Sequence, residues 1–97
     1  MPAYVILIRN KTTDPDEMKT YASKAGPAGR EHSPKVLAYN GALEALEGDA
    51  AEGLVLIQFE DMAKAKVWYE SPGYQEAMQH RLKGADYRVI LAEGLTG

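Results

Sequence analysis

Apolar residues gather along the chain in four short runs, each with the length of a β-strand. The runs cover residues 3–8, 36–40, 54–59 and 87–93. The first and third are nearly unbroken, which is typical of strands buried on both faces. The second and fourth contain more polar residues, as edge strands do. The pattern predicts a four-stranded sheet with the first and third strands at its centre, and extended chain after the second strand, continuing past Gly41 to Leu46.

Between these runs, apolar residues recur at helical spacing and predict two helical segments. Asp14 can cap the first segment and Pro15 fits its first position, whereas Gly26-Pro27 is expected to kink or end it. The second segment begins after Asp61 and breaks near Ser71-Pro72, where a new helical piece can start. The second helix is therefore expected in two parts.

The predicted order is strand, helix, strand, strand, helix, strand. This is the βαββαβ pattern of a ferredoxin-like fold with a four-stranded antiparallel sheet. The 97 residues suffice for one domain. We therefore expect a single α+β, ferredoxin-like domain over residues 1–97.

Two helical segments can cover only one face of this sheet, yet the central strands are apolar on both faces. In the first strand, Tyr4, Ile6 and Ile8 alternate with Ala3, Val5 and Leu7. An uncovered apolar face usually marks an interface. We expect a homodimer packed sheet against sheet, a dimeric α/β barrel; the alternative is a monomer with an open apolar sheet.

Composition excludes several classes of protein. Eleven Lys and Arg against fourteen Asp and Glu leave no basic stripe for nucleic acid. Without cysteine, and with two histidines far apart, we expect no metal site. No glycine-rich phosphate loop is present, and we expect no cofactor. The absence of a long apolar run or a signal-like start predicts a cytoplasmic protein with no membrane contact.

Aromatic residues cluster around the expected helix break. Trp68, Tyr69 and Tyr74 lie within seven residues of one another. They either pack on the sheet as core residues or form the wall of a small-molecule pocket. The same three residues are therefore candidates for a ligand pocket.

Two charged or titratable side chains are further candidates for this pocket. Arg81 falls on an otherwise apolar helix stripe, where it either pairs with a carboxylate such as Glu93 or binds a carboxylate or enolate of a ligand. His32 is either an exposed loop residue or a base near neutral pH.

Several segments of the chain form a distinctive set: Ala3–Ile6, Asp14-Pro15, Leu46–Asp49 and, most specifically, Trp68–Gln75 followed by Arg81. Together they resemble the domain of unknown function family 1330, a member of the dimeric α/β-barrel superfamily. The chain departs from the family at Glu31-His32-Ser33-Pro34, where a Gly-Gly pair is usual, so the resemblance assigns no ligand role to this loop. That superfamily includes cofactor-independent monooxygenases, isomerases and haem enzymes, so the resemblance implies fold and dimerisation rather than a reaction.

Three functions are compatible with the sequence. The first is a protein that binds a small organic molecule, anionic if Arg81 reaches it, between helices and sheet. The second is a cofactor-free monooxygenase or isomerase acting on an activated carbon acid, with Arg81 stabilising an enolate and His32 or a tyrosine moving the proton. The third is a structural dimer module without a ligand.

Overall fold

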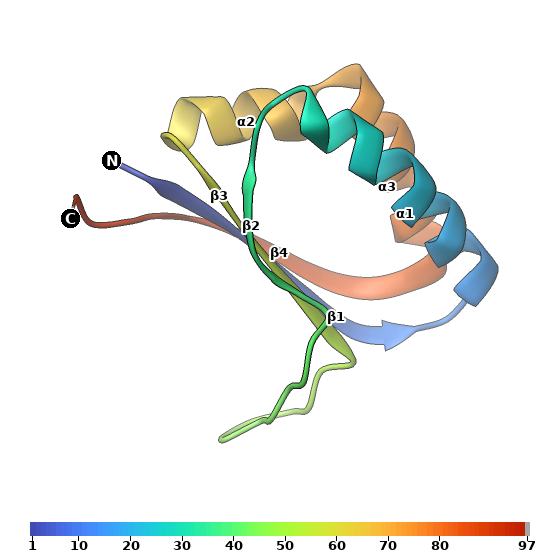
Figure 1. Cartoon of the computed structure of the whole chain (residues 1–97). Helices are drawn as coiled ribbons and strands as arrows, with labels where there is room; N and C mark the ends of the chain where they lie inside the picture. Colours follow the sequence, from blue (N-terminus) through green and yellow to red (C-terminus); the bar gives the residue numbers. More distant parts are fainter. Residues whose placement is uncertain (97) are drawn as a thin grey trace.

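The computed structural model describes residues 1–96, which form four strands and three helices (Figure 1). In chain order these are β1 (Ala3–Thr12), α1 (Pro15–Arg30), β2 (Lys35–Tyr39), β3 (Gly53–Phe59), α2 (Met62–Glu70), α3 (Pro72–Gly84) and β4 (Ala85–Glu93). The strands form one antiparallel sheet in the order β2-β3-β1-β4. The predicted α+β, ferredoxin-like fold is confirmed, with β1 and β3 at the centre.

Side-chain caps fix where the helices begin. Asp14 accepts hydrogen bonds from the backbone N–H groups at the start of α1. Asp61 accepts one from Lys64 at the start of α2. Ser71 accepts one from the N–H of Tyr74 and so separates α3 from α2. The predicted break of the second helix is therefore confirmed.

The first helix does not end at Gly26-Pro27, which was one of the two outcomes expected there. Helix α1 continues through Pro27 to Arg30. A proline inside a helix removes the hydrogen bond to the carbonyl four residues earlier, here that of Ser23. Both Pro27 and Ser23 are exposed, so water can hydrate that carbonyl and the helix tolerates the loss.

The expected extension of the second strand to Leu46 is wrong. Strand β2 ends at Tyr39, and residues 41–50 are exposed and belong to no strand. Asn40 adopts a positive φ of 48°, which turns the chain out of the sheet. The segment between β2 and β3 forms a loop that projects beyond the sheet (Figure 1).

The apolar stripe predicted around Arg81 comprises Tyr74, Ala77, Met78, Leu82 and Ala85, and the buried side of α3 differs from it at Leu82 and Gly84. Tyr74, Ala77, Arg81 and Gly84 are buried, whereas Leu82 is 59% exposed. Gly84 packs closely against Met18 of α1. The buried side of α3 therefore faces α1, and Leu82 lies outside it.

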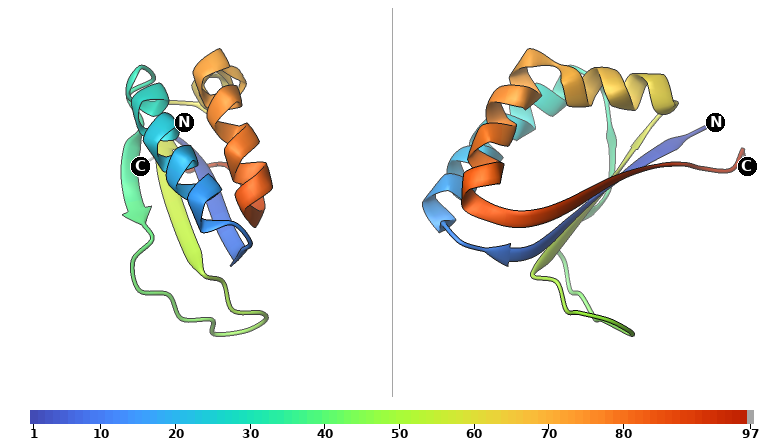
Figure 2. Two further views of the ribbon diagram at one scale, coloured as in Figure 1. Left: turned by 90° about the vertical axis from the view of Figure 1, so that its right-hand side faces the viewer. Right: turned by 180° about the vertical axis from the view of Figure 1, so that it is seen from behind.

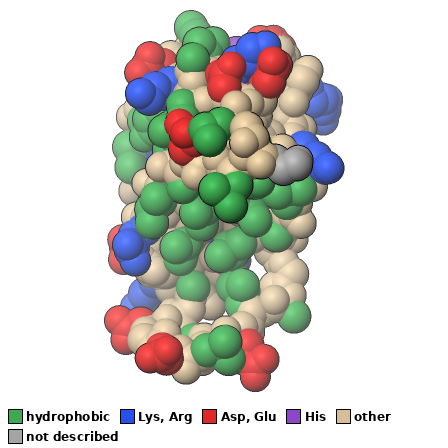
Figure 3. All heavy atoms as spheres, turned by 90° about the vertical axis from the view of Figure 1, so that its left-hand side faces the viewer, with side chains coloured by type: hydrophobic (Ala, Val, Ile, Leu, Met, Phe, Trp, Pro, Cys, Tyr) green, Lys and Arg blue, Asp and Glu red, His purple; other side chains and the backbone are tan. Residues whose placement is uncertain are grey.

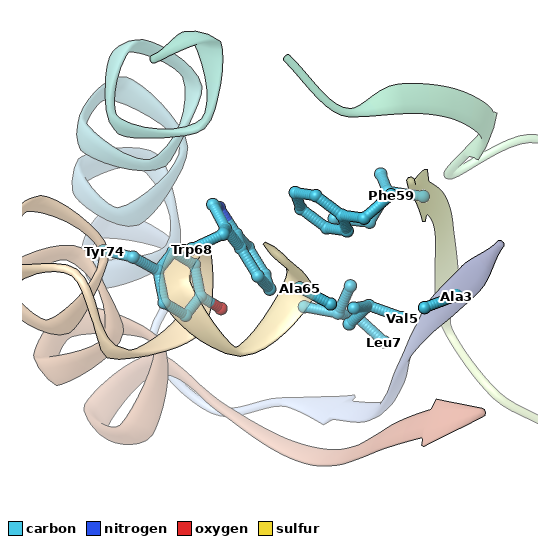
Figure 4. Packing of buried hydrophobic residues seen from close by; sticks show 8 residues of the cluster. Ala3, Val5, Leu7, Phe59, Ala65, Trp68 and Tyr74 are labelled. Atoms are coloured by element: carbon cyan, nitrogen blue, oxygen red, sulfur yellow. The ribbon is translucent and has the colours of Figure 1, made fainter. Parts of the chain in front are cut away.

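All three described helices lie on one face of the sheet (Figure 2). Ala3, Val5 and Leu7 of β1 point into the core on that side, together with Ile57 and Phe59 of β3. The other members of the core are Ala65, Trp68 and Tyr74 from the two C-terminal helices. Figure 4 shows Trp68 lying between Phe59 and Tyr74.

The opposite face of the sheet carries apolar side chains that no helix within residues 1–96 covers. Tyr4, Ile6 and Ile8 lie on this face, and Ile6 pairs with Leu56 on one side and Ile90 on the other. Figure 3 views the molecule from this side and shows hydrophobic side chains gathered across its middle. The sheet is therefore apolar on both faces, as the sequence indicates.

Candidate functional site

A cavity of about 530 Å³ lies between α1 and the inner face of the sheet. Helix α1 packs along α3 and contacts the strands little, so space remains beneath it. This volume lies within the range of small-molecule sites. The apolar part of the lining comes from the sheet and from α1, and includes Leu7, Val55, Ile57, Met18, Ala22 and Ala25.

Aromatic rings form the wall of the cavity toward α2 and α3. Trp68 and Tyr74 both line the cavity, with ring centroids 4.3 Å apart. Tyr69 packs against Tyr74 at 5.7 Å but is half-exposed and does not reach the lining. The three aromatic residues predicted as pocket candidates therefore lie together, and two of them face the cavity.

Three tyrosine hydroxyls add polar groups to this aromatic wall. The hydroxyls of Tyr21 and Tyr74 are hydrogen-bonded at 2.9 Å. Burial raises the pKa of Tyr21 far above the ordinary range, and the neighbouring Tyr74 raises it further. Burial also raises the pKa of Tyr87, although Arg9 and Arg81 act to lower it. Tyrosine hydroxyls are protonated at neutral pH, and burial makes ionisation of Tyr21 and Tyr87 still less favourable, so both hydroxyls can donate a hydrogen bond to a ligand.

Arg81 is buried at 4% exposure behind the cavity wall. Its guanidinium lies over the ring of Tyr87, 5.2 Å from the centroid, a cation–π arrangement. Within residues 1–96 it forms no salt bridge, and its Nε has no hydrogen-bond partner. The proposed ion pair with Glu93 is not formed in this part of the chain. Arg81 does not itself line the cavity.

Replacing Arg81 by leucine tests whether its buried charge stabilises the fold. Removing a buried charge that lacks a carboxylate partner is expected to leave the melting temperature unchanged or to raise it, because the charge pays a desolvation cost without a pair. Thermal denaturation followed by circular dichroism measures the change. Arg81→Lys is the control and should be less stable than the parent, because it keeps a charge and loses the planar stack. A loss of about 3–5 kcal/mol in Arg81→Leu would show a broken buried pair instead.

The structure does not place His32 in the lining of the main cavity. His32 lines a separate hollow with Phe59, Glu60 and Lys64. The other histidine, His80, is half-buried and contacts Glu17 of α1, with 2.7 Å between Nδ1 and Oε2. Neither imidazole lines the main cavity.

Arg9 and Tyr87 are among the residues that line the cavity but were not predicted as candidates. The signal for both was the alternation of the strands. Ala3, Val5 and Leu7 face the helices, and the next residue in that series is Arg9. Tyr87 lies directly opposite Arg9 on β4. The predicted strand ends at Ile8, so Arg9 was placed after the strand and not on its inner face.

Residues 1–96 contain no cluster of three His, Cys, Asp or Glu side chains suited to a metal ion. None of the helices in that range combines the length and the hydrophobicity that a membrane span requires.

The fold and the cavity define a small α+β domain of ferredoxin-like topology with an aromatic-walled pocket on one face of its sheet. The chain belongs to the family described as Domain of unknown function (DUF1330), whose sequence pattern matches residues 2–95. The predicted family membership is confirmed. No curated protein matches the chain in sequence.

Solved structures share this fold at low sequence identity. A protein of unknown function from Rhodopseudomonas palustris is 20% identical with a TM-score of 0.75, over 99% of this chain and 84% of that one. A dimeric ferredoxin-like protein of unknown function from Bacteroides fragilis is 11% identical with a TM-score of 0.65, over 96% of both chains. SnoaB, a cofactor-independent oxygenase from Streptomyces nogalater, is 9% identical with a TM-score of 0.63, over 99% and 94%.

Proposed function

We propose that the protein is a homodimer that binds a small organic molecule in the cavity beneath α1. The main observation that supports this proposal is the cavity. A cavity of about 530 Å³ in a chain of 97 residues leaves apolar and aromatic surface without packing partners, which costs stability unless a ligand fills it. A mostly apolar lining with a few polar groups is typical of small-molecule sites.

The open face of the sheet supports the homodimer. Its central residues Ile6, Leu56 and Ile90 lie side by side and form an apolar surface that a second copy can cover. The ferredoxin-like protein from Bacteroides fragilis is dimeric. Sheet-to-sheet packing buries this face and leaves the cavity, on the other face, open to ligands.

Fluorescence of Trp68 tests ligand binding directly, because Trp68 is the only tryptophan and lines the cavity. Titration with small organic acids and their neutral analogues, chosen for transparency at the excitation wavelength, is expected to change its emission and to raise the melting temperature. Ala25→Phe fills part of the cavity and should weaken binding at least about tenfold, through steric exclusion.

Ala63→Phe is the matched control for this experiment, because Ala63 is exposed on α2 and outside the lining. It should bind as the parent does. If no compound of either kind changes the fluorescence or the melting temperature, the cavity has no ligand function and the structural dimer is the better account.

A cofactor-free oxygenase or isomerase is the second candidate, favoured by the fold shared with SnoaB and by the protonated hydroxyl of Tyr21. Carbon-acid chemistry also needs a general base within reach of the substrate. In the described chain, no Asp, Glu or His side chain lines the cavity. The geometry therefore supports binding better than proton abstraction.

A further inference from the structure

We infer that one end of the cavity is an anion site, in which Arg9 holds the carboxylate of an aromatic monocarboxylic acid while the ring lies toward Trp68 and Tyr74. This inference rests on the proposed binding function and adds to it the chemical class of the ligand and its orientation. It also assigns anion recognition to Arg9 rather than to Arg81, which is buried behind the wall.

Arg9 occupies a position where the fold makes room for its guanidinium. It lies on the central strand β1 directly opposite Gly53 of β3. A Cβ at Gly53 would lie 2.6 Å from Arg9 Nη2 and 2.5 Å from Asn40 Oδ1, closer than such atoms approach. The missing side chain of Gly53 therefore allows the guanidinium and the amide of Asn40 to lie together over the sheet at the cavity.

Arg9 forms no salt bridge in the described chain; the pKa of the nearby Glu52 carboxylate is lowered mainly by its hydrogen bond with Thr12 and to a smaller extent by the charge of Arg9. Its Nη2 donates to the backbone carbonyl of Glu52 at 3.1 Å, and its buried Nε has no hydrogen-bond partner. The Glu52 carboxylate accepts from the backbone N–H of Thr12 at 2.6 Å. A guanidinium offers five N–H donors, so the hydrogen-bonding capacity of Arg9 is only partly used.

The neighbours of Arg9 complete a set of donors for an anion. Tyr87 lies opposite Arg9 on β4 and also lines the cavity. The Tyr87 hydroxyl is protonated at neutral pH, as tyrosine hydroxyls ordinarily are, and can donate a hydrogen bond. Asn40 supplies an amide to the same end of the cavity. A carboxylate, which accepts two parallel hydrogen bonds from a guanidinium, suits this group of donors.

The remainder of the cavity selects the body of the ligand. Away from Arg9 the lining is apolar and aromatic, ending at Trp68 and Tyr74. The other cation of the lining, Arg30, is exposed at the end of α1 beside Gly29, which lies against Trp68. The guanidinium of Arg9 lies at the polar end of the cavity, and the aromatic rings lie beyond it. The site therefore fits a single carboxylate on a flat apolar body better than a polyanion.

Calorimetry with naphthoate and its neutral amide tests this inference. The parent protein is expected to bind naphthoate about tenfold or more tightly than naphthamide, as a charge-assisted pair predicts. Arg9→Gln should weaken naphthoate binding about tenfold to a hundredfold and leave naphthamide binding unchanged. Arg88→Gln is the matched control, because Arg88 neighbours Tyr87 in sequence but is exposed on the opposite face, and it should bind as the parent does.

Gly53→Ala provides a second variant that keeps the arginine and displaces its guanidinium, and it should remove the same preference for naphthoate. Equal binding of naphthoate and naphthamide by the parent, or an unchanged preference in both variants, would overturn the anion site while leaving the cavity a ligand site. Binding of neither compound would also overturn the anion site. The proposed function is judged separately, by the wider titration of Trp68 fluorescence.

Discussion

Replacing Ile6 by glutamate is expected to convert a dimer into a monomer with a lower melting temperature. Ile6 lies at the centre of the open face, paired with Leu56 and Ile90. A carboxylate buried there without a partner costs several kcal/mol. A cost of about 4 kcal/mol raises the dissociation constant about a thousandfold. Because folding and association are linked, stability should fall together with the mass.

Light scattering measures this change. The parent at micromolar concentration should show twice the chain mass of 10.6 kDa, and Ile6→Glu should show the mass of one chain. Val67→Glu is the control, since Val67 is an exposed apolar residue on α2 and lies on the helical side; this variant should remain dimeric. A monomeric parent would refute the sheet-to-sheet dimer, as would a fully stable dimer in Ile6→Glu.

Replacing Trp68 by alanine is expected to lower the free energy of unfolding by about 3–5 kcal/mol. The indole is 4% exposed and lies between Phe59 at 5.3 Å and Tyr74 at 4.3 Å between centroids. The indole packs between the end of β3 and the start of α3, so its removal leaves a void between the sheet and the helices. The variant should also lose part of the wall of the ligand cavity.

Urea denaturation followed by circular dichroism is the suitable measurement for Trp68→Ala, because the variant has no tryptophan fluorescence. Parent and variant must be compared at one protein concentration, since the proposed dimer would add to the measured stability. Val67→Ala changes the preceding, exposed residue of the same helix and should cost less than about 1 kcal/mol. A similarly small cost for Trp68→Ala would mean that the aromatic stack contributes little to the packing of α2.

The arrangement of the strands could be predicted from the sequence because it depends on local patterns. The apolar runs of β1 and β3 required burial on both faces, and the caps at Asp14, Asp61 and Ser71 required helices to start there. These signals involve residues close together in the chain. They agree with one another, which is why the fold and the helix break were predictable.

The cavity could not be predicted in the same way because it depends on how far α1 stands from the sheet. That distance is set by contacts between α1 and α3, such as Tyr21 with Tyr74 and Lys24 with Glu76, which join residues more than fifty positions apart. Trp68 and Tyr74 were named as candidates because they adjoin the helix break. Arg9 was not among the candidates because the predicted strand ends at Ile8, whereas β1 continues to Thr12.

Because α1 packs on α3 rather than on the strands, residues that line the cavity can be substituted without changing residues on the open face of the sheet. Ala22 and Ala25 point their small side chains at the cavity from a helix that contacts the strands little. Larger or polar residues at these two positions would change the shape of the cavity without touching Ile6 or the other residues of the open face. Substitutions on this single helix can therefore alter the cavity while the apolar face of the sheet stays the same.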